Sequence, residues 1–150
     1  PVAEAETARL VVESLKALEA GKSPLVHTAL GPADERIGAT AAKLQAMGYD
    51  LLDLKLKSGE IFGRVLGNIV QTIFAGTGLR RACVAGGDTS TYAARQLRIE
   101  ALEMVGPMAP GSPLCRVSAA NGVIDGAEIT FKGGQVGRDD FFTSVLKGKP

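Results

Sequence analysis

Apolar side chains recur at helical spacing in three stretches of the first half of the chain. In residues 4–20 they fall in steps of three and four, which places them on one face of a helix. Residues 33–47 predict a second helix, and residues 61–76 keep the same period over about four turns, as a helix with one buried face does. Each stretch ends at a glycine or directly before one, and glycine commonly closes a helix.

The remaining apolar runs are shorter and mostly typical of strands. Residues 23–30 favour a strand, whereas residues 49–56 fit either a strand or a helix. Four further runs predict strands at residues 81–87, 99–106, 113–119 and 127–134. Helical patterns also occur at residues 90–97 and 138–146, the second with Asp139 near its N-cap.

Turn signals concentrate in the last third of the chain. Asn121-Gly122 and Asp125-Gly126 are dipeptides typical of tight turns between strands. Helices therefore come first and alternate with strands, and strands joined by short turns follow. This order predicts one α/β domain over residues 1–150, a three-layer sandwich whose sheet is mixed and partly parallel.

Composition and charge narrow the class of protein. The chain has 150 residues, 45% of them apolar, which is enough for one hydrophobic core. Its 17 basic and 16 acidic residues nearly balance, so we expect no nucleic-acid partner. No apolar run approaches the roughly 20 residues that span a bilayer, and no leader signals export, so we expect a cytoplasmic protein without a membrane partner. Cys83 and Cys115 lie in apolar runs and predict reduced core thiols.

Two predicted strands end in the same unusual feature, a pair of glycines. One strand runs into Gly86 and Gly87, and another runs into Gly133 and Gly134. Glycine at a strand end lets the backbone adopt positive φ and come close to a ligand. A helix that begins just after such a turn offers unpaired N–H groups and the positive end of its dipole, which favour phosphate.

Polar side chains flank both glycine pairs. Asp88, Thr89 and Ser90 follow the first pair, where their oxygens can cap the next helix or bind ribose, phosphate or a metal ion. For Asp88 the two interpretations are a helix cap and a Mg²⁺ ligand. Lys132 precedes the second pair and offers positive charge to phosphate, although an isolated strand lysine is more often solvated. Glycine pairs with such neighbours are also ordinary turn chemistry, and the chain has neither standard phosphate-loop fingerprint.

Three spaced motifs in the second half resemble one known family. The chain reads VAGGDTS, then APGSPLCR, then FKGGQVGRDDFF, in the order and spacing found in the C-terminal domain of the four-carbon acid sugar kinases. These include the 3-oxo-tetronate, threonate and erythronate kinases. The resemblance is specific over residues 82–143, whereas residues 1–81 agree only in helical character and length.

The resemblance implies that the chain is the ATP-binding part of a two-domain kinase. In that family an N-terminal domain binds the acid sugar, and we expect this domain to be missing from a chain that starts at Pro1. The nucleotide-binding motif of the family falls on residues 86–89, and its second nucleotide-contacting glycine falls on Gly134. In this second loop Gly133, Gln135 and Val136 stand where the family usually has Ser, Asn and Phe.

The sequence is therefore compatible with three functions. The resemblance favours a kinase that transfers the γ-phosphate of ATP, with Mg²⁺, to a hydroxyl of a four-carbon acid sugar. The alternative is a non-catalytic domain that senses a nucleotide or another phosphate ligand, and the third is an assembly domain with structural glycine turns. For the kinase we expect the isolated chain to be inactive, because the sugar-binding part is missing. Whether the chain forms a homo-oligomer stays open.

Overall fold

The computed structural model describes residues 2–134 and 136–149 of the chain. Three helices come first, and four strands with two shorter helices follow. The elements, in chain order, are α1 (Val2–Glu19), α2 (Glu35–Ala46), α3 (Leu51–Gly76), β1 (Arg81–Ala85), α4 (Gly87–Gln96), β2 (Ile99–Ala109), β3 (Ser112–Ala119), β4 (Glu128–Lys132) and α5 (Phe141–Lys147). The three predicted long helices and the four predicted strands of the second half are thereby confirmed.

The strands form one mixed sheet in the order β1-β4-β3-β2. β1 and β4 are parallel, and their last pair is Ala85 with Lys132. β3 is antiparallel to both β4 and β2, and the β2–β3 hairpin turns at residues 110–111. The sequence predicts that this strand ends at residue 106, before Pro107, but β2 continues to Ala109. Proline has no N–H to donate to a neighbouring strand. Such a residue is tolerated in β2 because β2 is an edge strand and its register shifts near Pro107.

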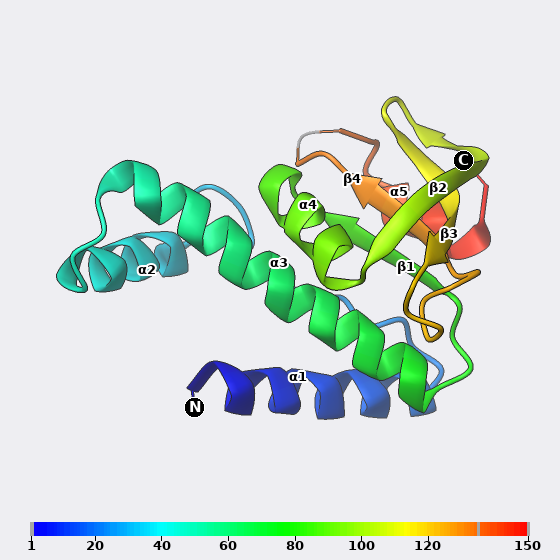
Figure 1. Ribbon diagram of the computed structural model, residues 1–150, viewed down its shortest axis with the longest axis horizontal. Coiled ribbons are helices and arrows are strands. Elements are labelled where there is room, and N and C mark those ends of the chain that lie inside the picture. The colour runs from blue at the N-terminus through cyan, green and yellow to red at the C-terminus, as the bar shows by residue number, and fades with distance from the viewer. Residues whose placement is uncertain (1, 135, 150) are drawn as a thin grey trace.

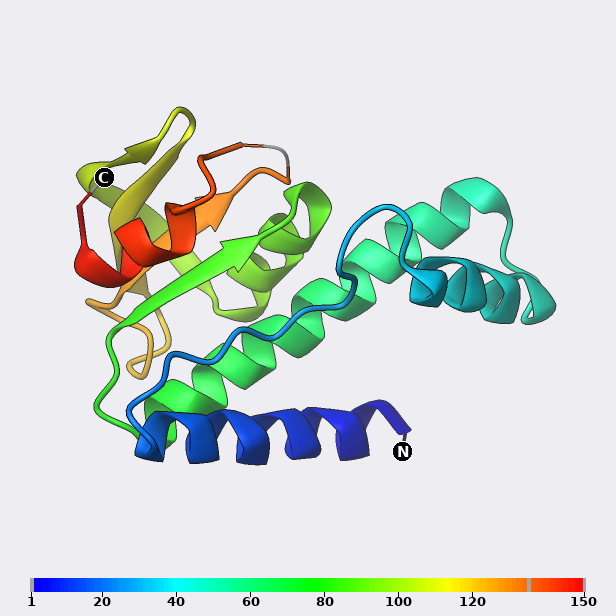
Figure 2. The same ribbon diagram turned by 180° about the vertical axis from the view of Figure 1, so that it is seen from behind.

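Helices cover both faces of the sheet, which makes three layers (Figure 1, Figure 2). One face carries a core with α3 and α4 in which Leu97, Ile124 and Ile129 are fully buried. The other face carries a second core, in which Phe141 and Val145 of α5 pack with buried residues of β2 and β3. The predicted three-layer α/β sandwich with a mixed, partly parallel sheet is confirmed.

The helices of the first half lie largely outside the sheet. α1 and α2 pack against α3, which extends well beyond the sheet (Figure 1). α4 crosses α3 at Gly59, Gly63 and Gly67, which are spaced about one turn apart and leave little room for side chains. An added Cβ at Gly63 would lie only 2.5 Å from Cβ of Tyr92. This close approach positions α4, and with it the first glycine turn.

Several local predictions differ from the structure. Residues 23–30 form no strand, because a strand needs a neighbour that pairs with its backbone, and no described residue pairs with the backbone of this segment. Residues 49–56 mostly belong to α3, so the helical interpretation is the right one. α4 begins earlier than predicted, at Gly87. α5 begins later than predicted, at Phe141, and its N-cap is Asp140, next to Asp139. No helix in the described part of the chain is both long and apolar enough to cross a membrane.

Candidate functional site

The two glycine turns lie side by side at one edge of the sheet. β1 and β4 are parallel, so their carboxyl ends meet there, and the ladder ends at the pair of Ala85 and Lys132. Just beyond this pair, the N–H of Gly86 donates to the carbonyl oxygen of Lys132 at 2.8 Å. Two segments that are far apart in the sequence therefore form one continuous edge.

The first turn has a conformation that needs glycine. Gly86 has φ 118° and ψ 134°, and an added Cβ would lie 3.3 Å from Cβ of Thr89. Gly86 is also the N-cap of α4 and makes no side-chain capping hydrogen bond. The N–H groups of Gly87, Asp88 and Thr89 have no hydrogen-bond partner among the described residues. The start of α4 therefore presents unpaired donors and the positive end of the helix dipole.

The three polar side chains of this turn have different environments. Ser90 is buried, and its hydroxyl donates to the carbonyl oxygen of Val84 at 3.2 Å, so it holds α4 against β1 and does not face a ligand. Thr89 is half-buried at the edge. Asp88 is exposed on the side of α3, where its Cβ lies 3.1 Å from the position of a Cβ at Gly59. Because Asp88 lies inside α4, it is not the N-cap, and the capping interpretation is wrong.

Lys132 holds the second turn. Its ammonium donates to the carbonyl oxygens of Gly133 and Gly134, at 3.1 and 3.2 Å, and lies 5.6 Å from the centre of the Phe141 ring. Positive charge is therefore present at the edge, but it is engaged with the carbonyl groups of the loop itself. The glycine that the backbone requires here is Gly137, which has φ 99° and lies close against Phe141.

Two of the predicted glycines have no conformational reason to be glycine. Gly87 and Gly134 lack positive φ, and an added Cβ at either would meet no described atom within 4 Å. The absence of a side chain at both positions keeps the space at the sheet edge open. Gly133 is more confined, because an added Cβ would lie 3.3 Å from Cγ2 of Val136. Gln135, a departure from the family pattern, lies outside the described residues.

A groove of about 1160 Å³ reaches these turns and follows the free edge of β1. Its lining includes Thr89, Lys132 and Gly134 from the two turns, apolar side chains of α3, and residues 23–31. Burial raises the pKa of the Cys83 thiol in its wall to about 11, against the opposing effect of the Lys132 charge. This thiol is therefore protonated near neutral pH and is no nucleophile. The groove is large enough for a nucleotide-sized molecule.

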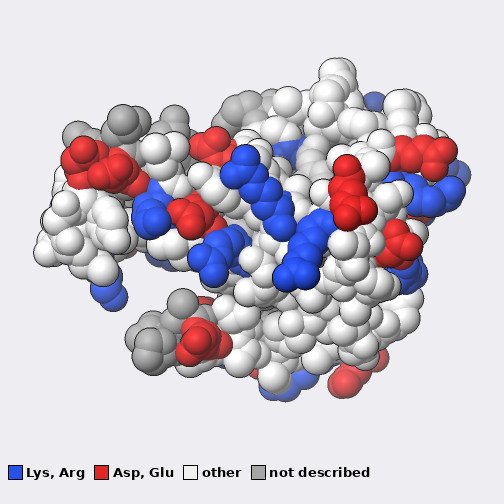
Figure 3. Space-filling model, in the orientation of Figure 1, with Lys and Arg blue, Asp and Glu red and all other residues white. Residues whose placement is uncertain are grey.

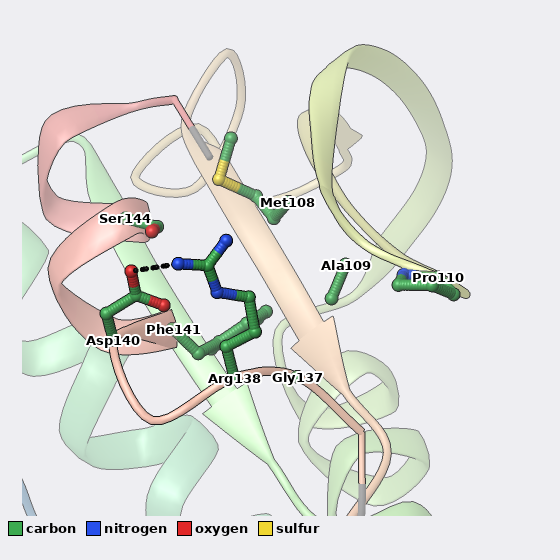
Figure 4. A pocket seen from close by; sticks show the side chains of 8 residues that line it. All are labelled: Met108, Ala109, Pro110, Gly137, Arg138, Asp140, Phe141 and Ser144. Atoms are coloured by element: carbon green, nitrogen blue, oxygen red, sulfur yellow. Dashed lines mark hydrogen bonds and ion pairs between the residues drawn. The ribbon is translucent and has the colours of Figure 1, made fainter.

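A smaller pocket of about 180 Å³ lies between the end of β2 and the start of α5 (Figure 4). Met108 and Ala109 line it from β2, and Phe141 lines it from α5. The side chains of Arg138 and Asp140 pair with each other at 3.2 Å beside it (Figure 4). Its volume is well below that of typical small-molecule sites, so we assign no ligand to it.

The side chains around the glycine turns suit a bound anion better than a metal ion held by protein side chains alone. On the face shown in Figure 3, basic and acidic side chains are interspersed and form no large patch of one sign. Within residues 2–134 and 136–149, no group of three or more His, Cys, Asp or Glu side chains could hold a metal. Mg²⁺ that arrives with a nucleotide needs only one or two carboxylates besides phosphate oxygens and water, and Asp88 is the carboxylate of this turn. The edge therefore fits a phosphate group, and its carboxylate, Asp88, lies on the side of α3.

Comparison with known proteins assigns the class. The chain belongs to the family described as the nucleotide-binding C-terminal domain, whose pattern matches residues 2–142. Over 97% of its length it is 37% identical to the 3-oxo-isoapionate kinase of Paraburkholderia graminis. Over 61% of its length it is 32% identical to the 3-oxo-tetronate kinase of Pseudomonas savastanoi pv. phaseolicola. The chain spans only 30% and 20% of the lengths of these two kinases.

Solved structures share the fold. The Haemophilus influenzae protein HI1011 matches with a TM-score of 0.60 and 18% identity, over 94% of this chain and 30% of that one. A Bordetella bronchiseptica protein, solved with bound citrate as a domain-swapped dimer, matches with a TM-score of 0.54 and 18% identity, over 95% and 36%. At such identities these structures establish the fold alone. The family and the two kinases confirm the resemblance to the C-terminal domains of the four-carbon acid sugar kinases.

Proposed function

We propose that this chain is the ATP-binding part of a kinase that transfers the γ-phosphate of ATP to a hydroxyl of a four-carbon acid sugar. The observation that carries the proposal is the meeting of two glycine turns at one sheet edge, beside the unpaired N–H groups of α4. The nucleotide-binding family and the kinase names of its relatives support it.

Each part of this edge has its own task in the proposal. The N–H groups of Gly87, Asp88 and Thr89 donate to phosphate oxygens, where the dipole of α4 favours negative charge. The open space at Gly87 and Gly134 lets the phosphates approach the backbone. Lys132 adds positive charge when a phosphate oxygen replaces one of its loop carbonyl partners. Asp88 would hold Mg²⁺ directly or through water, and the ion would supply positive charge against the phosphates.

We place the acid-sugar site outside these 150 residues. The chain spans only 30% of its 3-oxo-isoapionate kinase relative, so most of that kinase lies beyond the shared part. On this proposal the isolated chain binds ATP and phosphorylates no sugar. A cytoplasmic location accords with its two free cysteines. Assembly into a homo-oligomer is a further expectation, and the Bordetella protein of the same fold was solved as a domain-swapped dimer.

The proposal is tested by titration calorimetry of the chain with Mg·ATP, against inorganic phosphate alone. Gly87→Val and Gly134→Val should each weaken ATP binding by at least about tenfold. Both should keep the wild-type melting temperature, because an added Cβ at either position would meet no described atom within 4 Å. Both variants place a branched side chain where the phosphates should approach.

Gly122→Val is the matched control. Gly122 is equally open but follows β3, whose carboxyl end lies at the opposite end of the sheet from the two turns. This variant should keep both ATP affinity and melting temperature. A wild-type chain that binds no ATP, or three variants of equal affinity, would contradict the proposed site.

A further inference from the structure

β1 has one edge without a strand beside it. Within residues 2–134 and 136–149 it is an outer strand of the sheet and pairs only with β4. The N–H of Gly86 points toward β4, since it donates to Lys132. Because the peptide groups of a strand alternate in direction, the N–H and C=O groups of Arg81, Cys83 and Ala85 point the other way, into the groove that these residues line. A strand edge left in this state is a site for pairing with another extended segment.

An extended segment with unpaired peptide groups lines the same groove. Residues 23–29 have no regular structure, and their backbone makes no hydrogen bond to the backbone of any other described residue. Leu25 within the segment and Leu30 beside it are 57% and 81% exposed. The sequence SPLVHTAL nevertheless has the apolar, β-branched character of a short strand. The segment and the outer edge of β1 thus both present peptide groups without a backbone partner among the described residues.

We propose that residues 24–29 dock on the free edge of β1 as a fifth strand, parallel to it. The segment and β1 run in the same direction (Figure 2). The chain returns from the segment to β1 through α2 and α3, and a helical crossover is how parallel strands are joined. Six extended residues span about 20 Å, which is enough to cover the five residues of β1.

Both ends of the segment are anchored, so docking moves only its middle. The N–H of Lys22 donates to the carbonyl oxygen of Ala17 in α1. The N–H of Leu30 donates to the carboxylate of Asp34, the N-cap of α2, at 2.7 Å. Hydrogen bonds from the Arg36 side chain and from the Leu30 N–H hold the pKa of the Asp34 carboxyl well below its usual range, so this anchor stays charged.

Docking affects the edge that carries the glycine turns. Parallel strands end at the same edge of a sheet, so the docked strand would bring residues 29–31 beside the Gly86 turn. It would also pair the peptide groups of both partners and remove the exposed strand edge. The inference goes beyond ATP binding and does not depend on it.

Amide hydrogen exchange measured by NMR can compare the N–H groups of β1 that face the groove with those that face β4. The N–H of Cys83 faces the groove, whereas the N–H of Val84 faces β4. We expect the Cys83 amide to exchange at least about tenfold more slowly than an unstructured chain, in the free protein or with Mg·ATP. Protection of Cys83 below about tenfold in both conditions, with Val84 protected, would overturn the proposal. The free-protein measurement needs no ligand, so it stands even if ATP does not bind.

Two adjacent proline variants distinguish a paired strand from a coil that only covers β1. Successive N–H groups of a strand point in opposite directions, so only one of Val26→Pro and His27→Pro would remove a hydrogen bond to β1. We expect one variant to return Cys83 to the unprotected rate and the other to leave its exchange within about threefold of wild type. Equal effects of the two variants, in either direction, would overturn the docked strand.

Discussion

At Gly63 a single added methyl group tests how α4 is held in place. A Cβ there would lie 2.5 Å from Cβ of Tyr92, 2.7 Å from the carbonyl oxygen of Thr89 and 3.1 Å from the nitrogen of Ala93. These atoms belong to the backbone of α4 or are fixed to it, so no side-chain rotation relieves the contact. Since carbon atoms pack at about 3.5–4.0 Å, Gly63→Ala should push α4 away from α3 by on the order of 1 Å.

Two opposing terms set the loss of stability. Overpacking of a well-packed interior costs about 1–3 kcal/mol. Alanine is favoured over glycine in a helix interior by about 0.5–1 kcal/mol, which offsets part of that loss. Because the contacts lie far inside van der Waals distance, we expect a net loss of about 1–2.5 kcal/mol, or a fall in melting temperature of roughly 2–10 °C. ATP affinity should fall as well, since α4 carries the first glycine turn.

Gly38→Ala is the matched control for this measurement. Gly38 lies in α2, and an added Cβ would meet no described atom within 4 Å, so the same chemical change should raise stability by about 0.5–1 kcal/mol. Urea unfolding and thermal melting of both variants should therefore give changes of opposite sign. If Gly63→Ala is as stable as the wild type, the close crossing of α3 and α4 does not constrain the fold and the reasoning fails.

Three further predictions concern single side chains. Thr130→Val should raise the free energy of unfolding, measured by urea denaturation, by about 1 kcal/mol. The reason is that the Thr130 hydroxyl is fully buried and has no hydrogen-bond partner among the described residues. A loss of stability would show that this hydroxyl does make a hydrogen bond. Asp88→Asn should keep the melting temperature and weaken Mg²⁺-dependent ATP binding in calorimetry, and unchanged affinity would remove Asp88 from the metal site. Hydrogen bonds from Arg36 and Leu30 lower the pKa of the Asp34 carboxyl in the folded protein. The charged carboxylate therefore stabilises the fold at pH values above its unfolded pKa of about 4. This stabilisation is lost as the pH falls through the lower pKa of the folded state. The difference in melting temperature between wild type and Asp34→Asn should therefore shrink from about pH 5 to about pH 2, and a constant difference would contradict the assignment.

The features that could be predicted from the sequence alone are those that neighbouring residues determine. Helical periodicity located α1, α2 and the second half of α3, and the glycine pairs marked the ends of β1 and β4. Three spaced motifs were enough to identify the family, because they lie in one continuous half of the chain. The spacing of Gly59, Gly63 and Gly67 was equally visible as a four-residue repeat, but a repeat of glycines in a helix does not say which element crosses it.

Only the tertiary structure decided how these parts combine. The parallel pairing of β1 with β4 joined the two glycine turns, and that pairing depends on contacts between residues far apart in the sequence. The backbone conformation showed that Gly86 and Gly137 are required by φ, whereas Gly87 and Gly134 leave open space. The absence of a strand at residues 23–30 has the same origin, because a strand exists only when its peptide groups find a partner, and local sequence does not contain that partner.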